Sequence, residues 1–402
     1  MGKNAKFSGQ PIFSQLINFI PKDSFARIVS AHQADRYVKK FDSFHHLVTM
    51  LYAQFQNCNS LREIEIGMLA CKGKLNHLGV QHLPKRSTLA EANSRRTHEI
   101  FQDLYFSILD RYKQILSDSR NSWLDKRLYI LDATVISLFH DILPVAGRPR
   151  NDGRRKGGIK VHALLNASYD VPEMIVMKAA ADADRNELFN IKLPTKSILV
   201  FDKGYVNFDQ FNRFTSEEIT WVTRKTTSWV IEVIDEKKVD LHQEMNGVLS
   251  DQVVIVGNKT NKKQVRVRAR LVKFYDAESK REFEFVTNNF TMSPTTIAQI
   301  YQKRWQVELL FKRIKQNSQL YNFVGDNVNA IKIQIWCSLI ADLITKIVQK
   351  QTKVKYAYSN IATLIRLHFL SYVELFKFLN NPKLEFEVEL SREKQITLFS
   401  SA

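Results

Sequence analysis

The hydrophobic pattern of this chain changes its period twice, and this limits the folds that the chain can adopt. Before Leu128, apolar residues recur at three- and four-residue spacing, which predicts amphipathic helices at residues 24–39, 43–55 and 88–116. From Leu128 to Ile136 the apolar run is nearly continuous, as in a strand covered on both faces. Helical spacing returns after Ser293-Pro294, a typical helix start, and predicts helices at 293–315, 329–350 and 359–380. We therefore expect an α/β protein whose sheet comes from the middle of the sequence.

The middle region contains five expected strands with two short helices between the later ones. The strands are expected at 128–136, 159–165, 174–178, 197–201 and 219–223, with helices at 186–191 and 207–214. This order, βββαβαβ followed by a helix, is the order of an RNase H-like domain. A β-rich segment follows, in which residues 253–256 are expected to pair with a strand at 265–271.

The predicted fold class is therefore α/β: an RNase H-like core with a mixed five-stranded sheet, interrupted by a β-rich insertion and flanked by helical N- and C-terminal regions. The expected domains are a helical DNA-binding region at 1–120, the core at 121–225 and 291–325, the insertion at 226–290 and a helical region at 326–402.

Basic residues outnumber acidic ones, and this favours a polyanionic partner. The 59 Lys+Arg against 41 Asp+Glu give a formal charge of +18, which favours nucleic acid, while 26 Phe, 13 Tyr and 5 Trp exclude a disordered polycation. We expect no membrane partner, because no apolar stretch approaches the ~18 residues of a membrane span. Residues 1–6 have no apolar segment of a secretion signal, so we expect a cytoplasmic, nucleoid-associated protein. Cys58, Cys71 and Cys337 show no metal spacing and are expected to be buried thiols.

Four polar residues share one face of the helix predicted at 293–315. Tyr301, Arg304, Glu308 and Lys315 stand at offsets 0, 3, 7 and 14, which a continuous helix places within an arc of about 60°. An amphipathic surface helix with a pair between Arg304 and Glu308 is the simpler interpretation. The spacing Y-x2-R-x3-E-x6-K, however, resembles the signature of bacterial insertion-sequence transposases of the DDE type, in the group with a Y-R-E-K motif. The resemblance extends over residues 128–347, and residues 13–16 and 43–44 resemble an extra N-terminal domain of some of these proteins.

The resemblance implies a catalytic, metal-binding triad of Asp132, Asp202 and Glu308. Asp132 lies within a buried strand and Asp202 ends another; Asp182 and Asp184 are alternatives for the second ligand. An unpaired charge in such strands is costly to bury, so each carboxylate must reach a cation, a metal or a pocket. Carboxylates without Cys or an obligatory His suit Mg²⁺ or Mn²⁺, and the resemblance implies two ions.

The resemblance further implies cleavage at the ends of the element, followed by attack of the freed 3′-hydroxyl on target DNA. The expected partners are double-stranded DNA, as terminal inverted repeats and target, and a second copy in a homodimer on paired ends, supported by the apolar helices at 329–350 and 359–380. Two alternatives stay open: a catalytically silent, transposase-derived DNA-binding protein, and a related RNase H-like nuclease.

Several further residues are candidate DNA contacts. Tyr301, Arg304 and Lys315 match family positions that resemble backbone contacts. Lys160 and His162 lie two apart on one strand, although His162 could equally be a core histidine. The remaining candidates, each with a purely structural alternative, are Arg154 and Arg155 in the basic loop at 147–158, Arg266, Arg268 and Arg270 on one strand, and Trp221 and Trp229 as platforms for an extruded base.

Overall fold

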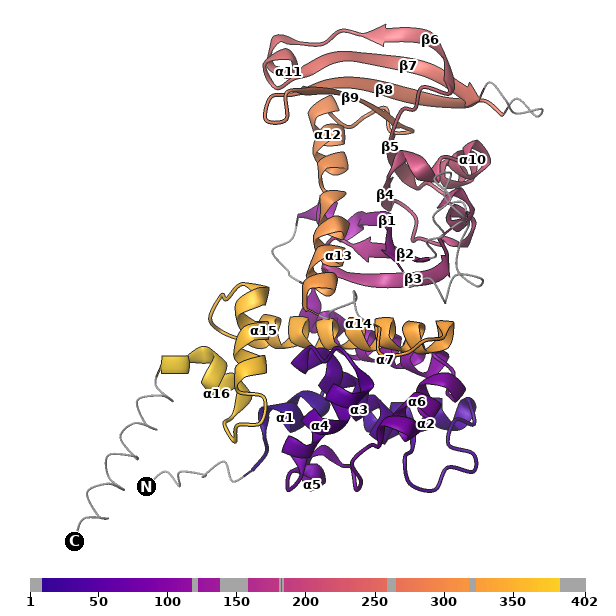
Figure 1. Cartoon of the computed structure of the whole chain (residues 1–402). Helices are drawn as coiled ribbons and strands as arrows, with labels where there is room; N and C mark the ends of the chain where they lie inside the picture. Colours follow the sequence, from indigo (N-terminus) through magenta and orange to yellow (C-terminus); the bar gives the residue numbers. More distant parts are fainter. Residues whose placement is uncertain are drawn as a thin grey trace. The chain divides into compact units, whose positions relative to one another are not determined.

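The computed structural model describes residues 9–117, 122–137, 158–180, 182, 184–258, 265–317 and 323–383. The chain divides into two compact units, Met1–Ser117 with Arg313–Ala402, and Asp118–Lys312. We call the first the helical unit and the second the sheet unit; Figure 1 labels their elements. The N-terminal and C-terminal helical regions that the sequence suggests as separate segments thus belong to one unit.

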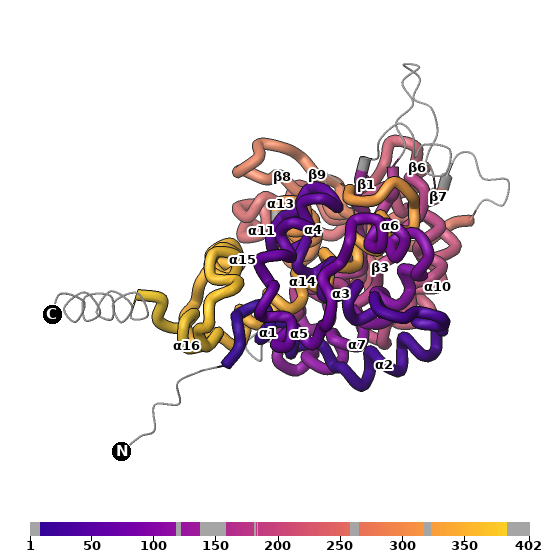
Figure 2. The backbone as a smooth tube through the Cα atoms, turned by 60° about the horizontal axis from the view of Figure 1, so that its bottom comes forward, coloured from indigo at the N-terminus to yellow at the C-terminus, as the bar shows by residue number. Residues whose placement is uncertain are grey.

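The helical unit is organised around α14 (Val328–Gln351), which packs against α3 (Ser43–Gln56) and α7 (Glu99–Leu116) (Figure 2). The apolar side chains of α14, such as Ile335 and Ile344, are buried inside this unit. They are therefore not available to support self-association, which the apolar pattern of residues 329–350 had suggested. The other helices of this unit are α1 (Ile12–Ile17), α2 (Lys22–Ala31), α4 (Leu61–Met68), the 3₁₀ turn η1 (Leu69–Cys71), α5 (Leu75–Leu78), α6 (Arg86–Arg95), α15 (Tyr358–Leu367) and α16 (Leu375–Asn380).

The helix expected at 88–116 is two helices, α6 and α7, and the break depends on Asn329 of α14. Its side-chain Nδ2 donates to the carbonyl oxygens of Asn93 and Arg96, at 2.8 and 2.7 Å, and its Oδ1 accepts from the His98 N–H at 3.1 Å. Arg96 adopts an extended ψ of 132° and its buried guanidinium donates to the Phe41 carbonyl. Hydrogen bonds to a distant side chain therefore replace those that would continue the helix.

The strands of the described residues form one nine-stranded mixed sheet in the order β3-β2-β1-β4-β5-β9-β8-β7-β6. β1 pairs antiparallel with β2 and parallel with β4, and β4 pairs parallel with β5. The α/β class is confirmed, and the strands of the expected insertion continue the sheet, because β9 pairs with β5. The strands are β1 (Leu128–Ser137), β2 (Gly158–Asn166), β3 (Val171–Ala179), β4 (Ile198–Phe201), β5 (Thr220–Arg224), β6 (Trp229–Lys237), β7 (Val248–Asn258), β8 (Val267–Asp276) and β9 (Arg281–Thr287).

Several helices accompany the sheet, and the one expected at 293–315 is broken. It forms α12 (Pro294–Gln302) and α13 (Trp305–Asn317), with a turn at residues 303–304. Ser293 caps α12 by accepting from the Thr296 N–H at 3.1 Å. Because of the break, Tyr301 and Glu308 do not lie on one continuous helical stripe. The remaining elements are α8 (Trp123–Arg127), the 3₁₀ segments η3 (Asp184–Asn190) and η4 (Lys203–Tyr205), α10 (Phe208–Ser216) and α11 (Leu241–Met245).

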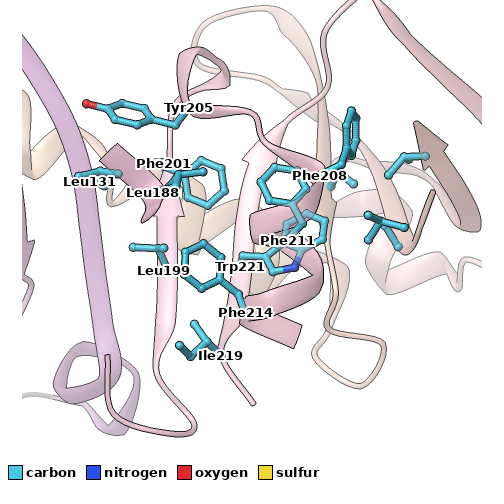
Figure 3. Packing of buried hydrophobic residues seen from close by; sticks show 14 of the residues in the cluster. Leu131, Leu188, Leu199, Phe201, Tyr205, Phe208, Phe211, Phe214, Ile219 and Trp221 are labelled. Atoms are coloured by element: carbon cyan, nitrogen blue, oxygen red, sulfur yellow. The ribbon is translucent and has the colours of Figure 1, made fainter. Parts of the chain in front are cut away.

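Aromatic side chains of α10 pack against the sheet and form the core beside β4 and β5 (Figure 3). Phe211 stacks on Trp221 with ring centroids 4.3 Å apart. Trp221 is fully buried, and Trp229 is only 6% exposed in the same cluster. The suggestion that either tryptophan stacks on an extruded DNA base is therefore wrong, since neither ring presents a face to solvent.

The alternating arginines of β8 do not form one basic face. The guanidinium of Arg270 is buried, pairs with both carboxylate oxygens of Asp251 at 2.7 Å, and donates to the Met292 carbonyl at 2.6 Å. Arg266 instead makes an exposed pair with Glu232 at 3.2 Å. Arg270 is covered because α12 packs over β7, β8 and β9.

Cys58, Cys71 and Cys337 are buried free thiols. In the described part of the chain, no helix is both long enough and apolar enough to cross a membrane.

The Arg270–Asp251 pair predicts a large loss of stability when one partner is removed. Asp251→Asn leaves the Arg270 charge buried without a counter-charge, which should lower the free energy of unfolding by ~3–5 kcal/mol. Urea denaturation measures this. Glu232→Gln removes the acid from the exposed pair with Arg266 and serves as the matched control, with little effect. Equal losses in the two variants would contradict this account of the pair.

Candidate active site

Asp132 and Asp202 are brought together by the parallel pairing of their strands. Leu131 of β1 pairs with Phe201 of β4; Asp132 follows Leu131 within β1, and Asp202 directly follows the last residue of β4. Neighbouring strands lie about 4.8 Å apart, so the two carboxylates stand at one level on adjacent strands. Both side chains are partly buried, with Asp132 16% and Asp202 30% exposed.

Glu308 is joined to Asp132 through the guanidinium of Arg304. Arg304 Nη1 donates to Asp132 Oδ2 at 2.5 Å, and Arg304 Nη2 donates to Glu308 Oε1 at 2.6 Å. Arg304 lies in the turn between α12 and α13 and its side chain is only 10% exposed. This pairing to Glu308 matches the structural alternative considered for Arg304, but the arginine also reaches β1. One buried cation therefore bridges two of the three carboxylates.

Asp202 has its own cation, Arg224, which the sequence did not single out. Arg224 Nη2 lies 3.3 Å from Asp202 Oδ1, and the Tyr301 hydroxyl donates to the same oxygen at 3.2 Å. The Arg224 guanidinium also lies over the Tyr301 ring, 5.4 Å from its centroid. Arg224 is placed here because β5 pairs in parallel with β4, so the carboxyl ends of both strands meet at one edge.

The environment pushes the pKa values of the two aspartates in opposite directions. Burial raises the pKa of Asp132 to about 6, and the negative charges of Asp202 and Glu308 add to this, against the Ala133 N–H and Arg304. Burial would also raise the pKa of Asp202, but Arg304, the Lys203 N–H and Arg224 outweigh burial and hold that pKa below its ordinary value. The carboxylates thus repel one another and depend on nearby cations.

Lys160 and His162 are engaged inside the sheet unit. Lys160 Nζ pairs with Asp184 Oδ1 at 2.6 Å. His162 is fully buried, and its Nδ1 lies 2.8 Å from the Tyr205 hydroxyl. Burial lowers the pKa of His162. A fully buried ring has no access to a DNA backbone, so we assign His162 to the support of the turn η4, which follows Asp202, and not to DNA contact.

The remaining sequence candidates lie elsewhere. Lys315 is in the second half of α13, in the part of that helix that belongs to the helical unit, which includes residues from Arg313 onward. Burial lowers the pKa of Lys315. Arg154 and Arg155 lie outside the described residues. Asp184, the alternative second ligand, has its carboxylate engaged by Lys160. Within the described residues, no group of three His, Cys, Asp or Glu side chains forms a ready-made metal cage.

A mixed sheet thus sets two carboxylates beside one another at the ends of paired strands, and Arg304 links a third carboxylate to the first. Comparison with known proteins identifies the family of this chain. Residues 123–341 match the family described as Transposase DDE domain, and residues 8–81 match a domain of unknown function (DUF4372). The chain belongs to the transposase DDE domain family, which confirms the resemblance to insertion-sequence transposases.

The chain is similar to several proteins of this kind. A Sinorhizobium fredii protein named as a transposase, y4zB, is 26% identical over 277 residues, which are 67% of this chain and 73% of that protein. The Geobacillus stearothermophilus protein named Probable transposase for insertion sequence element IS5377 is 26% identical over 294 residues, 72% of each chain. The cryo-EM structure of the piggyBac transposase synaptic complex with hairpin DNA matches with a TM-score of 0.43 and 10% identity, covering 94% of this chain and 82% of that chain.

The contact between Arg224 and Asp202 predicts a shift in the Asp202 pKa. Arg224→Gln removes a positive charge that stabilises the ionised carboxylate, so the pKa of Asp202 should rise. Carbon-13 NMR titration of selectively labelled aspartates measures this. Lys225→Gln is the matched control, because Lys225 pairs with Glu284 at 2.9 Å and not with Asp202. An Asp202 pKa that is the same in both variants would exclude Arg224 as its partner.

Proposed function

We propose that this protein is the DNA transposase of an insertion sequence, which cuts DNA at the ends of its element and joins the freed ends to target DNA. The observation that supports this most strongly is that Asp132 and Asp202 follow paired residues of adjacent strands, while Arg304 links Glu308 to Asp132. Membership of the transposase DDE domain family, whose model matches residues 123–341, supports the same function.

We propose further that strands β1 to β5 are an RNase H-like core. The order β3-β2-β1-β4-β5, with β2 antiparallel and β4 parallel to β1, is the arrangement that such a core requires. It sets the first aspartate on the first strand and the second aspartate at the end of the fourth. The strands β6 to β9 then form the insertion between β5 and α12.

The residues present fit a divalent cation. Their donors are carboxylate oxygens, which Mg²⁺ and Mn²⁺ prefer. Burial raises the pKa of Asp132, with a further contribution from the charges of Asp202 and Glu308, and added positive charge would favour its ionised form. In this proposal Asp132, Asp202 and Glu308 hold two ions. Bound divalent cations favour phosphoryl transfer by making water or a 3′-hydroxyl a better nucleophile and by offsetting charge on the phosphate.

The side chains around the carboxylates suit a DNA phosphate. The Nε atoms of Arg304 and Arg224 are buried and have no hydrogen-bond partner among the described residues. A phosphate cannot reach these buried atoms, but the Arg224 side chain is 30% exposed beside the carboxylates, so its positive charge can attract a phosphate oxygen. We propose that Arg304, Arg224 and the Tyr301 hydroxyl orient the scissile phosphate, so that its ester bond breaks as the nucleophile's bond to phosphorus forms. Lys315 stays a proposed contact, as do Lys160, Arg154 and Arg155.

The substrate would be double-stranded DNA, as terminal inverted repeats and target. We propose a homodimer because this reaction needs two DNA ends to be held together. The apolar side chains of α14 do not support it, since they are buried inside the helical unit.

The proposed triad predicts that replacing any one of its residues abolishes cleavage but does not weaken DNA binding. Asp132→Asn, Asp202→Asn and Glu308→Gln should each abolish Mg²⁺-dependent cleavage of the element's ends, because each removes a ligand charge and leaves the DNA-binding surface intact. Gel assays of cleavage and strand transfer into a plasmid measure this, with DNA binding in EDTA as the control. Asp184→Asn is the matched variant and should retain the reaction. Retained cleavage in a triad variant would remove that residue from the site. Cleavage by the unaltered protein with no strand transfer would instead favour a nuclease.

The raised pKa of Asp132 predicts how metal binding depends on pH. Folded Asp132 keeps its proton up to a pKa of about 6, above the ordinary 3.8, so in the metal-free protein this group lowers stability as pH rises through that interval. Metal binding needs the ionised form, so the gain in Tm on adding Mn²⁺ should increase between about pH 5 and about pH 7. Differential scanning fluorimetry measures this. Asp132→Asn should abolish the pH-dependent part, and a gain that is independent of pH in the unaltered protein would contradict the assignment.

A further inference from the structure

A basic groove begins beside Asp202 and extends over the inserted strands. It lies within the sheet unit at the carboxyl ends of β4 and β5 and continues along β8 and β9, and it encloses about 520 Å³. Its other lining residues are Glu282, Phe283 and Glu284. The cationic side chains that line it are Lys203, Arg224, Lys225, Lys273 and Arg281.

The two acids of the groove are each engaged by a neighbouring lysine. Lys225 Nζ lies 2.9 Å from Glu284 Oε1, and Lys273 Nζ lies 2.8 Å from Glu282 Oε2. Lys203 and Arg281 are exposed and have no ion-pair partner within the described residues. Five cations against two neutralised acids leave the groove positive, and the two unpaired cations are those that an incoming anion can reach.

The groove is connected to the candidate active site by two of its residues. Lys203 directly follows Asp202 in the chain, and Arg224 lies 3.3 Å from the Asp202 carboxylate. Arg224 also lies 5.9 Å from the centre of the half-buried Phe283 ring. An extended anion whose reacting group sits at the carboxylates would therefore continue into this groove, along a cationic lining with an aromatic side chain.

The size of the groove limits what it can hold. A volume of about 520 Å³ is in the range of pockets for drug-sized ligands, so it holds a short stretch of one strand and not the width of a duplex. Cationic side chains with an aromatic ring are also the lining that nucleic-acid strands use, with phosphates on the cations and the ring beside a base.

We propose that this groove binds the phosphate backbone of one DNA strand, the strand whose scissile phosphate lies at Asp132 and Asp202. The inference rests on the proposed function, and it adds a path for the strand and assigns that path to Lys203, Arg224 and Arg281. The inserted strands β8 and β9 thereby act as part of the substrate-binding surface.

The test measures DNA affinity without catalysis. Lys203→Gln combined with Arg281→Gln removes the two unpaired cations, and fluorescence anisotropy with a labelled duplex in EDTA follows binding as salt is varied. The log–log slope of affinity against salt should become shallower by about 1.8, at about 0.9 per phosphate contact. Lys192→Gln combined with Lys196→Gln is the matched control, since both lysines are exposed and precede β4 at its opposite end. It changes the net charge equally and should leave the slope nearly unchanged.

A second measurement locates the strand directly. The native cysteines are buried, so Lys203→Cys can be labelled selectively with a photo-crosslinker and compared with Lys192→Cys. Crosslinking of DNA from position 203 and not from position 192 supports the groove. An unchanged slope, equal changes in both double variants, or equal crosslinking would overturn it. These readouts need no metal, so the two proposals can fail separately. A protein that never cleaves DNA but shows the change in slope would refute the proposed function and support the groove. A protein that cleaves normally with an unchanged slope would support the proposed function and refute the groove.

Discussion

Burial of the Asp132 and Asp202 carboxylates next to one another is the constraint on which the rest of this site depends. Parallel pairing of β1 with β4 sets these two groups side by side, and burial keeps water from screening them. Such an arrangement is unfavourable unless positive charge is close by. Arg304 and Arg224 provide this positive charge.

The sheet explains why this chemistry and the basic groove share one edge. β4 and β5 run in parallel, so Asp202 and Arg224 follow them at the same end, and β9 pairs with β5 to bring the inserted strands alongside. The groove residues of β8 and β9 therefore continue the sheet edge at which Asp202 and Arg224 lie. Charge of opposite sign is separated over a short distance: acids face the proposed reaction centre and bases line the proposed path of the strand.

The features that could be predicted from the sequence are those determined locally. The nearly continuous apolar runs predicted the buried strands that carry Asp132 and precede Asp202, whereas the roles of these two aspartates were implied by the resemblance to DDE transposases and stay a prediction. The pairing of β7 with β8 was also predictable from alternation.

Features set by distant contacts were not predictable. Arg224 reaches Asp202 only through strand pairing, and the break at residues 303–304 accompanies the pairing of Arg304 with Asp132 on another strand. Arg270 follows an alternating pattern typical of a solvated face, yet α12 covers that part of the sheet and Asp251 neutralises the charge. Similarly, Asn329 of α14 binds the backbone at the end of α6 and at the start of α7.

The central claim is that the three carboxylates bind divalent cations together. Electron paramagnetic resonance of Mn²⁺ titrated into the unaltered protein and into Glu308→Gln tests it most directly, because Glu308 comes from a different element than the paired strands. The account predicts tight Mn²⁺ binding that is weakened at least about tenfold in the variant, as expected when a ligand to a metal is lost. Equal Mn²⁺ affinity in the two proteins would contradict it.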